Sequence, residues 1–147
     1  NFDERRPRLI VLHATEMRSA EAALRVLKTE NSGGRVSAHY LIAEDGRIFQ
    51  LVSDSKRAWH AGVSEFNGRQ NCNDFSIGIE LEGTEHHAYT DAQYQSLVLL
   101  TRQLMQDFPA ITLERIVGHQ QIAPGRKTDP GPSFDWDRYQ SALKENG

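Results

Sequence analysis

The sequence predicts a single-domain protein of the α/β (α+β) class, in which strands and helices alternate along the chain. Three observations lead to this prediction. Residues 9–12 are apolar at every position, which is typical of a strand covered on both faces of its sheet. Asp45-Gly46 separates two runs rich in β-forming residues, 36–43 and 47–52, and indicates a β-hairpin. Residues 90–108 carry apolar side chains at helical spacing, which predicts a long amphipathic helix.

Size and charge exclude several classes of protein. The chain has 147 residues, enough to bury a core without disulfide bonds. Its formal net charge of -3 gives no basic surface, so we expect no nucleic-acid partner. No apolar run approaches the roughly 20 residues that cross a bilayer, so we expect no membrane span. We also expect a monomer. Cys72 is the only cysteine, which excludes an internal disulfide and fits a reducing compartment slightly better than an oxidising one.

The first third of the chain predicts an arm, a strand and a helix. Residues 1–8 are polar and predict an extended N-terminal arm, so that residues 9–147 form the domain. His13 lies just past the first strand, where α/β sheets often build their sites. The alternative for His13 is a core histidine bonded to a backbone carbonyl. Residues 19–28 predict a helix with an apolar stripe, and a glycine-containing loop ends it.

Two segments in the middle of the chain each allow two interpretations. Trp59 and His60 precede a glycine in a loop, which is typical of a ligand groove and equally of a tryptophan that closes the core. Residues 76–82 alternate strictly between two faces of a strand. Gly78 and Glu80 share one of these faces, which leaves room for a ligand to approach. The alternative is a half-solvated strand with ordinary surface glutamates.

The C-terminal half predicts two helices and a short strand between them. Thr90 and Gln93 form a capping box that begins the long helix, and Pro109 ends it. Residues 115–117 predict the strand, and it leads into a glycine and a histidine. The last helix spans residues 135–144.

The loop after this strand contains three residues that suit a reaction centre. Two prolines and three glycines in residues 118–131 exclude a continuous helix or strand, so we expect a shaped loop. The first strand and the 115–117 strand each lead into a histidine, and if the strands are neighbours, His13 and His119 meet at one edge of the sheet. Asp129 can then fold back to them through the loop. The alternative is a salt-bridged surface turn.

Two histidines and one carboxylate are the ligand set of a catalytic zinc that leaves its fourth position to water. The nitrogen-rich set favours zinc over magnesium or calcium. A hydrolase of this kind also needs a proton acceptor and a cation. Glu80 is the candidate general base, which later protonates the leaving amine, and Lys127 is the candidate stabiliser of the oxyanion. These residues together predict metal-dependent hydrolysis of an amide.

Six segments along the chain resemble one known family. They are Leu12-His13, residues 36–39, 57–62 and 76–80, Gly118-His119 and residues 127–131. In this order they resemble the N-acetylmuramoyl-L-alanine amidases of the AmpD type, part of a zinc amidase family that shares its fold with peptidoglycan recognition proteins and phage amidase lysozymes. The resemblance covers nearly the whole chain, from residue 9 to the final helix. It implies a mixed central β-sheet flanked by helices.

The resemblance also implies a role for particular residues. The zinc ligands of the family fall on His13, His119 and Asp129, and its catalytic glutamate and lysine fall on Glu80 and Lys127. Zn²⁺ is therefore the expected cofactor.

Further positions match the groove that binds the substrate, namely Arg35, Trp59 and His60. The implied reaction cleaves the amide between N-acetylmuramic (or anhydro-muramic) acid and L-Ala of the peptide stem, in peptidoglycan recycling or remodelling. The expected partners are muropeptides or intact peptidoglycan. The alternative function is a recognition module that binds muropeptide without cutting it, which would be expected to lack a zinc ligand.

Some positions depart from particular members of the family. Ala38 stands where the phage enzymes carry a tyrosine, which favours catalysis by glutamate. The short connection between His13 and Arg35, like the opening of the chain, resembles envelope amidases of the AmiD type, and Asn71 replaces an arginine of AmpD. We therefore expect the bacterial cell envelope (periplasm) as the location, with the cytoplasm as the alternative. Because the chain begins at Asn1 and not with Met, we expect that an upstream segment was processed off or left out of this sequence, whether a start methionine, a secretion signal or a lipoprotein leader.

Overall fold

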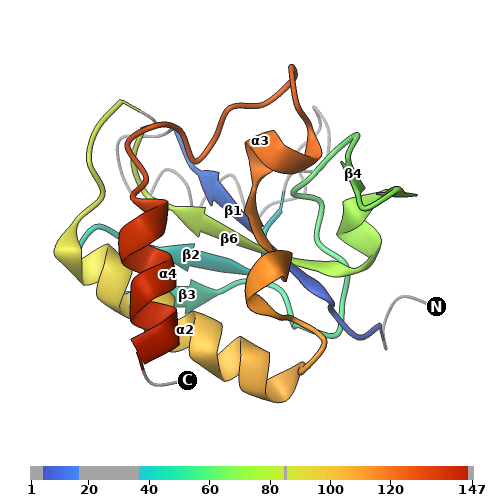
Figure 1. The fold of residues 1–147 in the computed structure, drawn as a ribbon, viewed down its shortest axis with the longest axis horizontal. Coiled ribbons are helices and arrows are strands. Elements are labelled where there is room, and N and C mark those ends of the chain that lie inside the picture. The colour runs from blue at the N-terminus through green and yellow to red at the C-terminus, as the bar shows by residue number, and fades with distance from the viewer. Residues whose placement is uncertain (1–4, 17–36, 85, 146–147) are drawn as a thin grey trace.

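A computed structural model describes residues 5–16, 37–84 and 86–145. Its centre is a mixed β-sheet in the order β3-β2-β6-β1-β7 (Figure 1). The strands are β1 (Leu9–Ala14), β2 (Tyr40–Ile42), β3 (Ile48–Gln50), β6 (Ser76–Leu81) and β7 (Ile116–Gly118). Neighbouring strands are parallel except for the β2–β3 hairpin, which is antiparallel. The predicted mixed sheet and the predicted hairpin are confirmed.

The two central strands, β1 and β6, are buried along their whole length because both faces of the sheet are covered. Alternate side chains of a strand point to opposite faces. Ile10 and Leu12 pack with Ile77 and Ile79 into the larger core on the helical face. Their neighbours Leu9 and Val11 belong to a smaller core on the other face.

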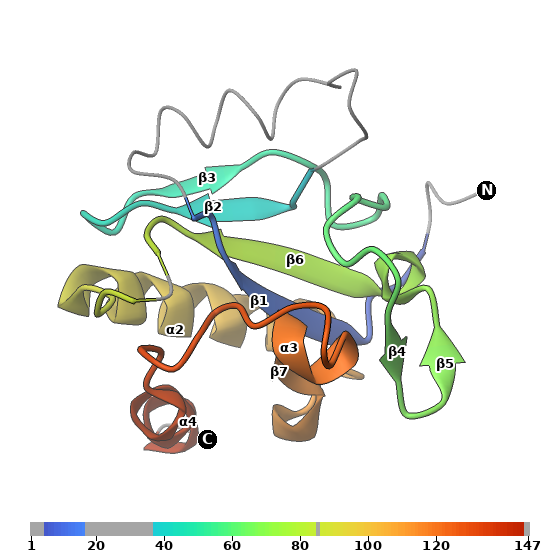
Figure 2. The ribbon, with the colours of Figure 1, turned by 90° about the horizontal axis from the view of Figure 1, so that it is seen from above.

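Two helices cover the first face of the sheet, α2 (Asp91–Asp107) and α4 (Trp136–Glu145) (Figure 2). The predicted capping box is confirmed at the start of α2. The Gln93 N–H donates to Thr90 Oγ1 at 3.1 Å, and the Thr90 N–H donates to Gln93 Oε1 at 3.0 Å. None of the described helices combines the length and the apolarity needed to cross a membrane.

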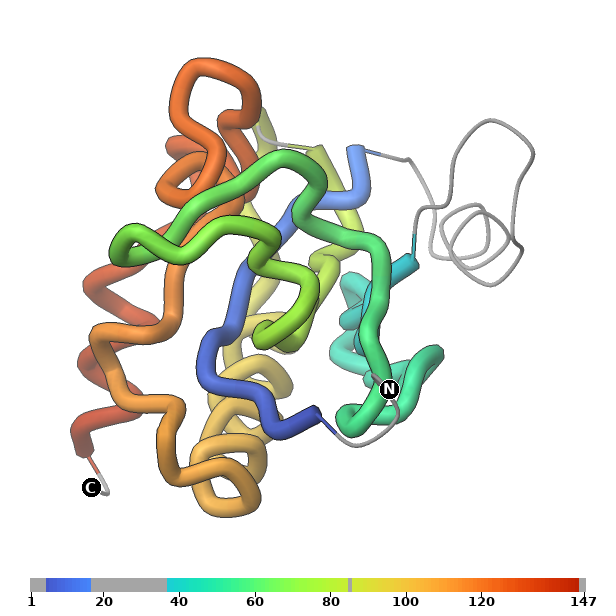
Figure 3. The backbone as a smooth tube through the Cα atoms, turned by 90° about the vertical axis from the view of Figure 1, so that its right-hand side faces the viewer, coloured from blue at the N-terminus to red at the C-terminus, as the bar shows by residue number. Residues whose placement is uncertain are grey.

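The second face is covered by the chain between β3 and β6 and by the short helix α3 (His119–Ile122). Between β3 and β6 lie β4 (Glu65–Phe66), β5 (Arg69–Gln70) and the 3₁₀ turn η1 (Cys72–Asp74); a second 3₁₀ turn, η2 (Leu113–Arg115), precedes β7. Figure 3 shows the segment with β4 and β5, in green, on the near side of β1, between the loop after α3 and the β2–β3 hairpin. This face carries the candidate site.

Two predictions and one alternative interpretation need correction. His13 lies inside β1 and not past its end, because β6 continues alongside and pairs Glu80 with His13 in parallel register. The predicted loop at 118–131 begins with the single helical turn α3, which ends before Pro124. The alternative of a half-solvated strand over residues 76–82 is wrong, since Ser76–Leu81 are all buried and the ring of His60 lies against Gly78.

The arm and the second predicted element are described only in part. Residues 5–8 lie against the body of the protein, where the Arg5 guanidinium donates to the carbonyl of Asn73 at 3.1 Å. Residues 1–4 and the helix predicted over 19–28 lie outside the described residues.

Candidate metal centre

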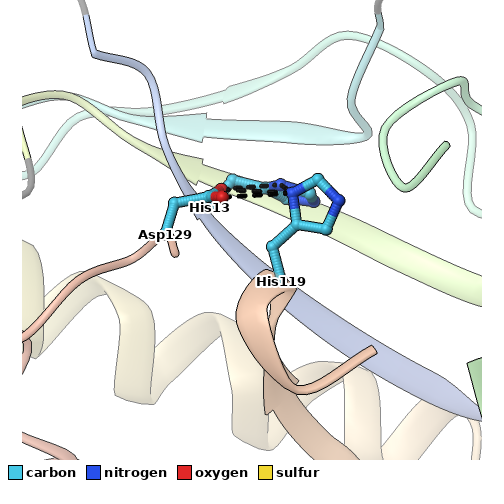
Figure 4. Close-up of side chains that lie close together, drawn as sticks. All are labelled: His13, His119 and Asp129. Atoms are coloured by element: carbon cyan, nitrogen blue, oxygen red, sulfur yellow. Dashed lines mark hydrogen bonds and ion pairs between the residues drawn. The ribbon is translucent and has the colours of Figure 1, made fainter. Parts of the chain in front are cut away.

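Two histidines and one aspartate meet on the second face of the sheet (Figure 4). Strands β1 and β7 are parallel neighbours, with Leu12 opposite Gly118. The residue that follows each of these two positions is a histidine of the site. The Nδ1 atoms of His13 and His119 lie 3.1 Å apart. Asp129 returns to them as predicted, with its carboxylate oxygens 3.2 Å from both Nδ1 atoms.

The spacing of these three atoms fits a tetrahedral metal ion. Bonds of about 2.0–2.1 Å to zinc separate two ligand atoms by roughly 3.3 Å, close to the separations in this cluster. The imidazoles of His13 and His119 are almost completely buried. Among the described residues, no other group of three His, Cys, Asp or Glu side chains comes close enough to hold one ion. The sulfur of Cys72 is not part of the group, so a closed four-ligand structural site is not formed here.

The charge states of the cluster also suit a metal ligand set. In the metal-free protein, burial raises the pKa of Asp129, but hydrogen bonds from His119 and His13 outweigh it and hold that pKa well below its usual value. Burial lowers the pKa of His13. The carboxylate is therefore ionised and the His13 imidazole neutral at pH 7, which are the forms that bind a divalent metal.

Glu80 lies beside the cluster on β6, where a proton acceptor was predicted. Its Oε2 atom is 3.9 Å from His13 Nδ1, and the residue is only 8% exposed. Burial, followed by repulsion from Asp129, raises the pKa of Glu80 to about 8, while the positive charge of Lys127 lowers it. The carboxyl group is thus close enough to exchange a proton with a molecule held at the centre.

Lys127 belongs to the exposed loop between α3 and Asp129. Its backbone N–H donates to the carbonyl of Ala123 at 3.0 Å, which shapes the loop around the centre. The charge of its side chain acts on both Glu80 and His13. The predicted roles of Lys127 and Glu80 stay predictions; Glu80 lies beside the cluster, and Lys127 is near enough for its charge to act on two residues there.

The predicted substrate-binding residues lie in different surroundings. Trp59 is 38% exposed, with the guanidinium of Arg57 4.2 Å from its ring centroid, so it does not close the core. His60 is 7% exposed and lies behind His13, with its Nδ1 atom 3.0 Å from His13 Nε2. Its contact is with a candidate metal ligand. Arg35 lies outside the described residues.

Sequence reasoning missed two residues near the centre, Ser76 and Ala61. The Ser76 hydroxyl lies 2.9 Å from His60 Nε2, and the Ala61 carbonyl lies 2.8 Å from His119 Nε2. A backbone carbonyl leaves no trace in a sequence. The sequence signal for the first contact is Gly78, since a Cβ atom there would lie 2.4 Å from the ring of His60.

Comparisons with known proteins agree with this geometry. The sequence model of the N-acetylmuramoyl-L-alanine amidase family matches residues 3–132. Over 109 residues the chain is 63% identical to the 1,6-anhydro-N-acetylmuramyl-L-alanine amidase AmpD of Salmonella typhimurium (strain SL1344), covering 74% of this chain and 58% of that protein. Over 120 residues it is 40% identical to the N-acetylmuramoyl-L-alanine amidase AmiD of Escherichia coli (strain K12), covering 71% of this chain and 43% of that protein.

A solved structure shows that the fold is shared as well. The complex of E. coli AmiD with the substrate anhydro-N-acetylmuramic acid-L-Ala-D-γ-Glu-L-Lys superimposes with a TM-score of 0.86 at 34% identity, covering 95% of this chain and 58% of that one. The chain thus spans less than two thirds of the length of these relatives.

Proposed function

The chain belongs to the N-acetylmuramoyl-L-alanine amidase family, and from this membership we propose that it is a metal-dependent amidase. The reaction is hydrolysis of the amide between the lactyl group of N-acetylmuramic or anhydro-muramic acid and L-Ala of the peptide stem. The observation that carries the proposal is the buried cluster of His13, His119 and Asp129 with Glu80 beside it. A module that only binds would need no such combination of ligands and proton acceptor.

We propose zinc as the metal, held by His13, His119 and Asp129. Two imidazoles and a single carboxylate suit zinc better than magnesium or calcium, and three protein ligands are the number found in catalytic zinc sites. When bound, zinc supplies a water molecule acidified to a pKa near 7 and polarises the carbonyl of the substrate.

Two residues near the cluster then have different roles in amide hydrolysis. Beside a divalent metal, Glu80 favours its ionised form, and its carboxylate then accepts a proton from the attacking water and delivers it to the nitrogen of the leaving L-Ala amine. The ammonium of Lys127 stabilises the negative charge that develops on the carbonyl oxygen of the substrate. The burial of Glu80 keeps bulk water away from its carboxyl group, which strengthens the electrostatic effects that act on it.

The proposed substrate is an anhydro-muropeptide, with intact peptidoglycan as a second substrate. The AmpD relative is named for its action on the 1,6-anhydro form, and the AmiD structure contains an anhydro-N-acetylmuramic acid peptide. These names support the proposal for this chain. The bacterial envelope is the proposed compartment and the cytoplasm the alternative; fractionation of the native cells distinguishes them.

The test compares two buried glutamates on the same stretch of chain. Glu80→Gln should keep one zinc per chain and lose turnover, because an amide cannot accept the proton. The control is Glu82→Gln, which should keep turnover, since Glu82 Oε1 only accepts from the N–H of Glu44 at 2.8 Å and an amide oxygen can do the same. Released peptide is measured by mass spectrometry. Full activity of Glu80→Gln would overturn the assigned role, and zinc binding without any product in the wild type would favour the recognition module.

A further inference from the structure

We propose that residues 60 and 61 form the outer shell of the metal centre and that His60 is a positioning residue for His13. In this role His60 holds the His13 imidazole in the form that presents Nδ1 to the metal. The inference rests on the metal site of the proposed function and extends it to residues that do not touch the ion.

The hydrogen bonds around His13 have only one consistent direction once Nδ1 binds a metal. The Nδ1 atom faces His119 and Asp129, so the ring proton of a neutral His13 is on Nε2. That Nε2–H donates to His60 Nδ1 at 3.0 Å, which places the proton of His60 on its own Nε2. The His60 Nε2–H in turn donates to the Ser76 hydroxyl oxygen at 2.9 Å. A continuous series of hydrogen bonds therefore connects the metal ligand His13 to Ser76.

The neighbouring residue fixes the second histidine in the same form. His119 Nε2 lies 2.8 Å from the carbonyl oxygen of Ala61, which can only accept a hydrogen bond. With a metal at Nδ1, the proton of neutral His119 is therefore on Nε2. The Arg126 guanidinium donates to the same carbonyl at 2.7 Å, and the Ala61 N–H donates to Asn73 Oδ1 at 2.8 Å. The side chain of His60 and the backbone carbonyl of Ala61 thus orient both ligand histidines.

The position of His60 is built into the sheet. Its backbone N–H donates to Asn73 Oδ1 at 3.1 Å, and its ring lies over Gly78 of β6. A Cβ atom on Gly78 would lie 2.4 Å from His60 Cγ, so only glycine leaves room for the ring. Because the ring is only 7% exposed and lies behind His13, it acts through the ligand and not on a substrate.

The test uses two substitutions of nearly equal shape. In His60→Asn the amide oxygen takes the place of Nδ1 and can accept from His13 Nε2–H, whereas His60→Leu has no acceptor. Zinc affinity is measured by competition with a chelator on the whole chain, and thermal unfolding of the metal-free variants checks their folding. We expect His60→Leu to weaken zinc binding by about 10–100-fold, the usual cost of losing an outer-shell partner, and His60→Asn to recover most of that loss.

The outcomes separate this inference from the proposed function. In one outcome the wild type binds zinc and releases peptide, while His60→Leu binds zinc as tightly as the wild type does. This result would overturn the positioning role and leave the proposed amidase function intact. If the wild type binds no zinc, both the positioning role of His60 and the proposed zinc-dependent function are overturned. Should His60→Leu fail to fold, Ser76→Ala replaces it; this variant leaves His60 Nε2–H without its acceptor and should weaken zinc binding. Unchanged zinc affinity in Ser76→Ala would then overturn the role.

Discussion

Gly78→Ala adds a single methyl group to the middle of β6, at a place where the structure has no room for it. The new Cβ would lie 2.4 Å from His60 Cγ and 2.7 Å from His60 Nδ1. The backbone cannot retreat easily, because Gly78 pairs in register with Val11 of β1 and its N–H donates to His39 Nδ1 at 3.1 Å. The ring of His60 must therefore move.

The size of that movement follows from the contact distances. An ordinary carbon contact begins at 3.4 Å, so the ring must shift by about 1.0 Å (3.4 − 2.4) to clear the methyl group. Hydrogen bonds of this kind weaken beyond about 3.2 Å, so the bonds from His60 to His13 and Ser76 would be lost or bent. Overpacking of a buried site costs about 1–3 kcal/mol, which lowers the melting temperature of a chain of this length by about 2–12 °C.

Two measurements on Gly78→Ala test this reasoning. Thermal unfolding of the metal-free protein gives the cost of overpacking, and zinc affinity should fall by about 10–100-fold as the outer shell is displaced. The control is the double variant Gly78→Ala/His60→Ala, in which the ring that meets the methyl group is absent. Adding Gly78→Ala to His60→Ala should then cost far less than adding it to the wild type, with a coupling of about 0.5–3 kcal/mol. Equal costs in both backgrounds, or unchanged zinc affinity in the single variant, would refute the account of His60.

Three further predictions concern the centre itself. Asp129→Ala removes one of three ligands, so metal content should fall from one zinc per chain to near zero and peptide release should stop with it; elemental analysis and mass spectrometry check both. Lys127→Met should keep the metal and lower kcat by about 10²–10³-fold, the usual cost of removing an oxyanion stabiliser, and normal kcat would exclude that role. In the metal-free protein the pKa of Glu80 is raised from 4.5 to about 8, so its folded form binds a proton more tightly than its unfolded form. Its stabilising contribution should be complete below pH 4.5 and be lost as the pH rises to 8. Denaturant unfolding of the wild type and of Glu80→Gln should therefore diverge over that interval, and parallel curves would contradict the raised pKa.

The ligand cluster could be predicted from the sequence because its geometry follows from local patterns. Continuous apolar runs indicate strands buried on both faces, and such strands lie at the centre of a sheet. Once the two strands are neighbours, the histidines that follow them meet at one edge. The prolines and glycines before and after Asp129 indicate a loop that can return to that edge. The one step that no local pattern supports is the adjacency of the two strands, which lie far apart in the sequence, so their pairing could be stated only as a condition.

The surroundings of the cluster could not be predicted in the same way. His60 contacts His13 across 47 residues of chain, and no local pattern reports such a contact. The alternation along residues 76–82 allowed two interpretations, a face that a ligand can approach and a half-solvated strand, because glycine and glutamate are ordinary residues on a surface. In the structure this face is covered. Gly78 leaves room for the ring of His60, and Glu80 places a carboxyl group beside His13.

The extent of β1 shows a related limit. Histidine is neutral in strand propensity, so the sequence suggested that the strand ended before His13. The pairing of His13 with Glu80 extends the strand by two residues, and this pairing depends on a segment 67 residues later in the chain. The same pairing brings the predicted proton acceptor to the predicted metal ligand.

The most direct test of the proposed function is a paired measurement on the wild-type protein. Zinc content is determined on the purified chain, and the products from an anhydro-muropeptide are identified by mass spectrometry before and after removal of the metal by a chelator. A metal-dependent amidase predicts one zinc per chain and release of a peptide that begins with L-Ala, lost on chelation and restored by zinc. Peptide release that persists without metal, or a zinc-loaded protein that releases no peptide, would contradict it.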